Sequence, residues 1–196
     1  MSNFENETLD IILEHFYRLT GLSEKDFEVL NSHKDKLSEW IDEVVKDFYD
    51  TLFSYEPTAK MFREDERPKV EKMLRDWYLG LLESSKEHSF WAHQWFVGLV
   101  HISRDVKNVY MHGMMSRIQN LFCEKCFQTF PPEEAKEVFL SFKKITDAIA
   151  SVIAEGYMDQ YIEAIARMSG IKRPVIERMA KLESKNMIEE YREKLG

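Results

Sequence analysis

The chain has 196 residues, of which 44% are hydrophobic and 32% are charged, and its formal net charge is −8. This balance predicts one folded domain rather than a disordered chain, and the scattered basic residues argue against nucleic acid or membrane partners. The polar start "MSNFENETLD" does not resemble a signal peptide, and no apolar run is long enough to span a membrane. Two cysteines predict no disulfide framework, so we expect a cytoplasmic protein.

The first half of the chain shows apolar residues at helical spacing, with few glycines or prolines. The first predicted helix spans residues 7–19 and ends at Gly21, a residue suited to a C-cap. The second begins at Ser23, a predicted N-cap with Asp26 in the first turn. The third predicted helix is long and covers residues 32–54.

A break follows in "SYEPTAKMFREDERP", which contains two prolines. The second proline suits the first turn of a helix over residues 68–82. A loop is predicted at residues 84–88, before the aromatic stretch at residues 90–101. Two further helices are predicted, over residues 107–128 and 133–168, and they are separated by "TFPPEEAK".

The last of these helices carries a stripe of apolar residues separated alternately by four and three positions: Val138, Phe142, Ile145, Ile149 and Val152. Such a stripe is typical of a helix–helix dimer seam, and a single helix packed on its own core shows the same spacing. After Gly170 a charged amphipathic helix follows, which is expected to cap the domain, to pair with a partner or to lead into a linker. We therefore predict an all-α protein of about eight helices, with a domain at residues 1–168 and a helical extension at 169–196.

His101 stands alone on the apolar helix "FWAHQWFVGLVH". Val97 and Gly98 lie one turn before it. A glycine inside a helix costs about 1 kcal/mol relative to alanine, so we interpret Gly98 as making room for a flat group beside the histidine. A lone helical histidine is more often a satisfied core residue, but the glycine, the aromatic surroundings and the lack of nearby carboxylates favour a ligand for a buried apolar cofactor.

Other chemistry finds less support in the sequence. His88, His93 and His101 do not align on one helical face, and neither Glu-x-x-His nor His-Glu-x-x-His occurs. Cys123 and Cys126 have the Cys-x-x-Cys spacing without the second pair that zinc would need, which leaves two small hydrophobic residues or a redox-sensitive thiol pair. No phosphate-binding loop or nucleophile elbow occurs, so we do not expect an enzyme.

Four short motifs, "DFYDTL" (47–52), "LRDWYLGLL" (74–82), "WAHQWFVGLVH" (91–101) and "VYMHGM" (109–114), occur in a characteristic order. They resemble, in turn, the distal Phe-Tyr helix, the helix after it, the proximal helix and the following helix of globin-coupled sensors and protoglobins. The resemblance covers about residues 20–165, and an additional N-terminal helix is also characteristic of this branch. It implies an all-α, globin-like fold that binds haem b (iron protoporphyrin IX).

The resemblance also implies a role for each matching residue. His101 falls on the proximal iron ligand, and Tyr49 falls on the distal tyrosine that hydrogen-bonds bound gas. The alternative for Tyr49 is a core tyrosine whose hydroxyl bonds a local backbone partner. The positions implied to line the haem pocket are Phe48, Tyr49, Val70, Met73, Trp77, Val97, Gly98 and Tyr110. The segment after His101, "ISRDVKN", is one residue shorter than is usual in the family, and the distal helix has no histidine. Met73 is expected either to restrict the pocket or to approach the iron.

The implied function is reversible binding of a diatomic gas (O2, CO or NO) at a pentacoordinate haem. The signal would pass through a homodimer of the last two core helices to a downstream signalling protein. Two alternatives remain open, a haem enzyme for nitric oxide detoxification or peroxidase-like chemistry, and a haem-free globin-like module of stress signalling.

Overall fold

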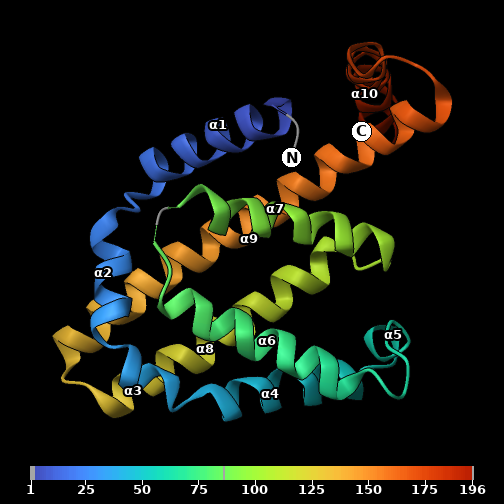
Figure 1. Ribbon diagram of the computed structural model, residues 1–196. Helices are drawn as coiled ribbons and strands as arrows, with labels where there is room; N and C mark the ends of the chain where they lie inside the picture. Colours follow the sequence, from blue (N-terminus) through green and yellow to red (C-terminus); the bar gives the residue numbers. More distant parts are fainter. Residues whose placement is uncertain (1–2, 86, 196) are drawn as a thin grey trace.

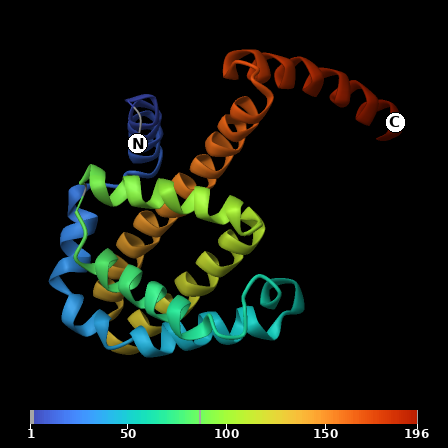
Figure 2. The same cartoon turned by 45° about the vertical axis from the view of Figure 1, so that its right-hand side comes forward.

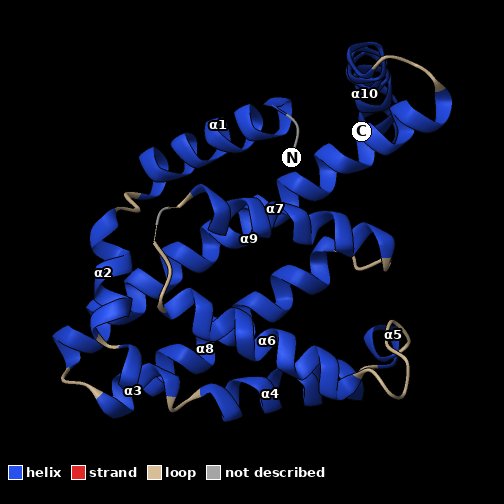
Figure 3. Cartoon of the chain, viewed as in Figure 1, coloured by secondary structure: helices blue, strands red, loops and turns tan. Residues whose placement is uncertain are grey.

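The computed structural model describes residues 3–85 and 87–195, with side chains from residue 7 onward. Within this part of the chain every regular element is a helix (Figures 1 and 3). The helices are α1 (Asn3–Thr20), α2 (Glu24–Ser32), α3 (Lys34–Ser38), α4 (Ile41–Ser54), α5 (Glu56–Ala59), α6 (Arg67–Leu82), α7 (His88–Ser103), α8 (Asn108–Thr129), α9 (Pro132–Ser169) and α10 (Arg173–Leu195). None of the described helices is both long enough and apolar enough to cross a lipid bilayer.

Local signals set several helix boundaries as predicted. Gly21 ends α1 with a φ of 68°, and its N–H donates to the carbonyl of Tyr17 at 3.0 Å. The Asp26 carboxylate accepts the backbone N–H of Ser23 at 2.8 Å, which forms a capping box at the start of α2. Gly170 ends α9 in the same left-handed conformation, with a φ of 71°.

Two predicted boundaries are wrong. The helix predicted over residues 32–54 is divided, because the chain turns at Glu39 and Trp40 between α3 and α4. Trp40 is buried, and its ring meets Phe122 of α8 edge-on at 5.2 Å, so tertiary packing and not a local breaker sets this bend. The stretch predicted as a break contains the short helix α5. The predicted loop at 84–88 includes residue 86, which lies outside the described residues.

Helix α9 is the central element of the fold. It packs against α2, α7 and α8, and Figure 1 shows it running diagonally behind α7. The buried Trp95 of α7 lies against Gly156 of α9, and the rings of Phe122 and Phe142 stack at 3.6 Å. Helix α6 packs on α4 instead, so α6 and α7 belong to different packing layers and lie apart in both ribbon views (Figures 1 and 2).

The last turns of α9 extend beyond the body, and α10 turns away from it (Figure 2). No described residue of α10 is buried, so this helix does not cap the domain, which was one of the three roles expected for the tail. An ion pair between Arg173 and Asp159, at 2.5 Å, holds the first turn of α10 on α9. The boundary expected at residue 168 lies at the end of α9.

Candidate functional site

His101 lies in the last turn of α7 with its side chain half-buried. Its Nδ1 atom is buried and has no hydrogen-bond partner among the described residues. Burial lowers the pKa of the imidazole, because the charged form loses its hydration. The ring is therefore neutral near pH 7, which is the form that binds metals. A buried, orphaned nitrogen on a neutral ring fits a ligand better than the satisfied core histidine that was the alternative.

Gly98 has a different role from the one predicted. A Cβ built on it would lie 2.6 Å from the nitrogen of Tyr157, 2.7 Å from the carbonyl oxygen of Ile153 and 2.9 Å from the carbonyl carbon of Gly156. Gly98 therefore faces the backbone of α9 at a helix crossing, and not a space beside His101. The interpretation that it admits a flat group is wrong. A glycine is needed because the two backbones approach too closely for a side chain.

Tyr49 is buried on α4, and its hydroxyl donates to the backbone carbonyl of Val70 on α6 at 2.7 Å. The half-buried Phe48 ring lies 5.0 Å away, edge to face. Burial raises the pKa of Tyr49, so the phenol stays protonated and remains a donor at physiological pH. The neutral hydroxyl predicted for gas recognition is present, and a backbone carbonyl accepts its hydrogen bond.

Of the pocket residues predicted on α6, Trp77 contacts α7. Trp77 Nε1 donates to the side-chain oxygen of Gln94 at 3.2 Å, and Gln94 is only 2% exposed on α7. Met73 lies one turn before Trp77 on the same side of α6, and yet it is 57% exposed. Val97 is half-buried one turn before His101, and Tyr110 is half-buried in the first turn of α8. The side of α6 beyond the Trp77 contact is therefore not covered by α7.

A second connection between α6 and α7, the Glu66–Arg104 bridge, escapes prediction from the sequence. Arg104 is the C-cap of α7, and its guanidinium donates to both carboxylate oxygens of Glu66, at 2.7 Å and 3.2 Å. The Glu66 side chain is 6% exposed. Hydrogen bonds from Arg104, and then from the backbone N–H of Arg63, lower the pKa of Glu66 to about 2. The two residues are 38 positions apart, so no local pattern indicates the pair.

The two cysteines are best explained as small hydrophobic residues. Cys126 is fully buried, and burial raises the pKa of its thiol to about 12, whereas Cys123 is half-buried. A buried thiol with a raised pKa is unreactive, which favours small hydrophobic residues over a redox pair. Among the described residues, no group of three or more His, Cys, Asp or Glu side chains could hold a metal ion.

The stripe predicted as a dimer seam is buried inside the chain. All five of its residues have no exposed surface: Val138, Phe142, Ile145, Ile149 and Val152. They belong to the core that α9 forms with α2, α7 and α8, so a second chain cannot reach them and that prediction is wrong. Another stripe on the final turns of α9 has the same alternating spacing and is exposed: Met158, Tyr161, Ile165 and Met168.

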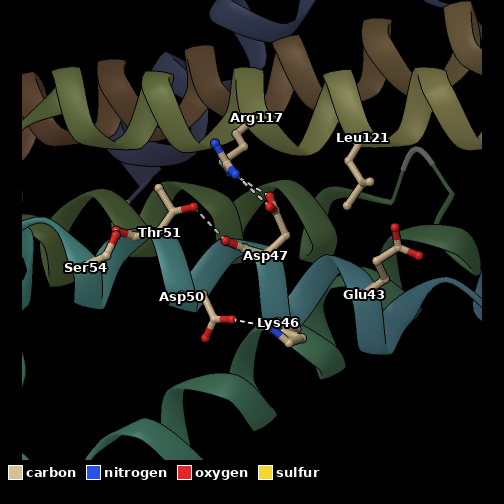
Figure 4. A pocket seen from close by; sticks show the side chains of 8 residues that line it. All are labelled: Glu43, Lys46, Asp47, Asp50, Thr51, Ser54, Arg117 and Leu121. Carbon is tan, nitrogen blue, oxygen red and sulfur yellow. Dashed lines mark hydrogen bonds and ion pairs between the residues drawn. The ribbon is translucent and has the colours of Figure 1, made fainter.

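A surface groove between α4 and α8 contains none of the predicted site residues (Figure 4). Its side chains are mostly paired with one another. Arg117 donates to both carboxylate oxygens of Asp47, at 2.6 Å and 2.7 Å, and Lys46 pairs with Asp50. Tyr49 lies between these acidic residues in the sequence but points into the protein. The predicted site residues therefore lie outside this groove, on α4, α6, α7 and the first turn of α8.

Comparison with known proteins agrees with this arrangement. A family model described as Protoglobin matches residues 12–163. The uncharacterized protein MJ1356 of Methanocaldococcus jannaschii is 30% identical over 112 residues, which is 56% of this chain and 59% of that protein. This chain thus matches less than two thirds of the relative's length.

The globin domain of a Geobacter sulfurreducens globin-coupled sensor superposes with a TM-score of 0.69 at 20% identity, over 74% of this chain and 96% of that domain. At this identity the likeness establishes the fold. The all-α, globin-like fold predicted from the sequence is therefore confirmed, and with the family match over residues 12–163 this chain belongs to the protoglobin family.

Proposed function

We propose that this chain binds haem b through His101 and reversibly takes up a diatomic gas, without catalytic turnover. The neutral imidazole with a buried, unpartnered Nδ1 carries this proposal, and family membership supports it. Bound haem would supply an iron with one open coordination position, at which O2, CO or NO can bind. The residues that would hold and cover the group are His101 and Val97 on α7, together with Met73 and Trp77 on α6.

Tyr49 would distinguish between gases by hydrogen bonding. Its hydroxyl lies in a dry environment, because the rings of Phe48, Phe53 and Phe62 lie 5.0–6.2 Å from its own ring. To donate to a gas, the hydroxyl has to leave the carbonyl of Val70, so one hydrogen bond replaces another. Bound dioxygen would be a charged acceptor, and a hydrogen bond to a charged acceptor is about twice as strong as one to a neutral carbonyl. The net gain is therefore on the order of 1 kcal/mol, or about fivefold in affinity. A weak acceptor such as carbon monoxide does not gain from the exchange.

The absorption spectrum of the purified full chain tests haem binding. We expect a Soret band that shifts with carbon monoxide and is lost or strongly weakened in His101→Ala. His93→Ala is the matched control, because His93 is exposed on the same helix, and it should keep the wild-type spectrum. An unchanged spectrum in His101→Ala would mean that another residue is the ligand. A colourless protein that haemin does not reconstitute would support the haem-free module, and steady turnover with a reductant would support an enzyme.

We further propose that the chain forms a homodimer through the exposed stripe on α9, which would pass the signal on toward a downstream partner. Ile165 lies in this stripe and is 40% exposed, and Leu140 is 42% exposed on the same helix outside it. Light scattering should therefore show a monomer for Ile165→Glu and a dimer for Leu140→Glu. Dissociation by both variants, or by neither, would contradict this interface.

A further inference from the structure

The Glu66–Arg104 bridge joins the two helices that carry the proposed ligand contacts. Arg104 follows His101 by three positions at the end of α7, and Glu66 is the N-cap of α6. Three donors converge on this nearly buried carboxylate, two from Arg104 and one from the backbone N–H of Arg63 at 3.1 Å. Because α7 packs on α9 and α6 packs on α4, the bridge ties together two packing layers.

On the α6 side, the bridge leads to Tyr49 through consecutive contacts. The carbonyl of Glu66 accepts the N–H of Val70 at 3.0 Å, in the first turn of α6. The carbonyl of Val70 in turn accepts the Tyr49 hydroxyl at 2.7 Å. A displacement of Glu66 therefore moves the carbonyl that holds the hydroxyl, because both belong to one helical turn.

On the α7 side, Arg104 lies in the turn that follows His101. The N–H of Val106 donates to the carbonyl of His101 at 2.9 Å, and Asp105 between them adopts a φ of 54°. Arg104 is thus fixed to the same helix end as His101. When this helix end moves, Arg104 moves the Glu66 carboxylate with it. The planar bidentate contact fixes both the separation and the relative orientation of the two groups.

We propose that Glu66 and Arg104 are positioning residues that hold the Val70 carbonyl against the Tyr49 hydroxyl, so that the end of α7 controls how freely Tyr49 donates to a bound gas. The gas-binding part of this inference rests on the proposed function. With the bridge closed, the carbonyl competes with the gas for the hydroxyl. When the bridge is broken, the first turn of α6 loosens, the competing bond weakens and the hydroxyl becomes more available.

The test uses the full chain as purified, with Glu66→Gln and Arg104→Met as the disrupting variants. Arg104→Lys keeps the charge and loses the bidentate geometry, so its effects should be intermediate. Arg117→Met is the matched control, because it removes a bidentate pair of similar geometry between α4 and α8. Circular dichroism and urea unfolding establish that each variant folds.

Oxygen and carbon monoxide dissociation rates give the first measurement. Glu66→Gln and Arg104→Met should slow oxygen dissociation about threefold or more, which corresponds to part of one hydrogen bond, while carbon monoxide dissociation stays unchanged. In a Tyr49→Phe background the same variants should have no effect. An oxygen rate that is unchanged or faster would overturn the proposal, and so would an equal effect in the Tyr49→Phe background, which would indicate a merely structural role.

The second measurement does not need haem. In protein labelled with 3-fluorotyrosine, the 19F resonance of Tyr49 is identified by its loss in Tyr49→Phe. This resonance should shift in both disrupting variants and stay in place in Arg117→Met. A protein without haem would refute the proposed function and leave this comparison intact. If the Tyr49 resonance does not shift in Glu66→Gln and Arg104→Met, the positioning role is refuted, whether or not haem binds.

Discussion

The crossing of α7 and α9 allows a sharp prediction for Gly98→Ala. An alanine Cβ would lie 2.6 Å from the backbone nitrogen of Tyr157, whereas ordinary contact begins at 3.4 Å. The neighbours are backbone atoms, so no side chain can move aside. The two helices would have to separate locally by about 0.8 Å, and a gap of this size forfeits roughly a quarter to a half of the dispersion energy of the atoms around it.

Two effects oppose each other in this variant. Alanine is favoured over glycine in a helix by about 1 kcal/mol, and overpacking of a tight contact costs about 1–3 kcal/mol, occasionally more. Because the clash is with three backbone atoms of α9, we expect overpacking to win. Gly98→Ala should lower the free energy of unfolding by up to about 2 kcal/mol.

Urea unfolding followed by circular dichroism measures this change, and the chain provides matched controls. Gly80 in α6 and Gly113 in α8 are also helical, and a Cβ at either would meet nothing within 4 Å. Gly80→Ala and Gly113→Ala should therefore raise the free energy of unfolding by about 0.5–1 kcal/mol. If Gly98→Ala were stabilised like these controls, the close crossing would be refuted and space for a flat group beside Gly98 would again be the better explanation.

Four further predictions concern single residues. Tyr49→Phe should speed oxygen dissociation about fivefold and barely alter that of carbon monoxide; equal effects on both gases in flash photolysis would remove the hydrogen-bond role. Asp105→Gly should raise the free energy of urea unfolding by up to about 1 kcal/mol, because Asp105 has a φ of 54°; a loss of stability would contradict this. The Glu66 pKa falls from 4.5 to about 2 on folding, so in that interval the unfolded chain binds more protons and stability rises with pH. The contribution of Glu66 should be complete above pH 4.5 and lost toward pH 2, and Glu66→Gln should flatten unfolding curves measured across this interval; an unchanged pH profile would show that Glu66 contributes nothing. Because the Cys126 thiol has a pKa of about 12, mass spectrometry after iodoacetamide treatment of the native protein at about pH 8 should find it unmodified until urea is added; rapid native labelling would refute its burial.

The sequence predicts best those features that depend on neighbouring residues. The capping box of Ser23 and Asp26 and the C-cap at Gly21 are local, and both appear where they were expected. The residues around Glu39 and Trp40 do not indicate the turn between them, because its cause is the packing of the Trp40 indole against a residue of α8.

For the site, the sequence suggests candidate residues but does not reveal their environments. A glycine near His101 has the same sequence signal whether it faces a cofactor or another helix, and only the position of α9 decides between them. The spacing of the stripe from Val138 to Val152 likewise fits both a core helix and a dimer seam. Its complete burial shows that it belongs to the core. No sequence pattern predicts the Glu66–Arg104 ion pair, because its residues are 38 positions apart and meet only after folding.

The length of α9 has a mechanical consequence. Gly156 sits at the contact with α7, and Ser169 ends the helix thirteen residues later, a distance of about 20 Å at 1.5 Å per residue. If α9 tilts by about 10° about the contact near Gly98, the end of the helix moves by roughly 3.5 Å. A tilt that barely changes the packing of the core would therefore displace the start of α10 by several times the movement at the contact.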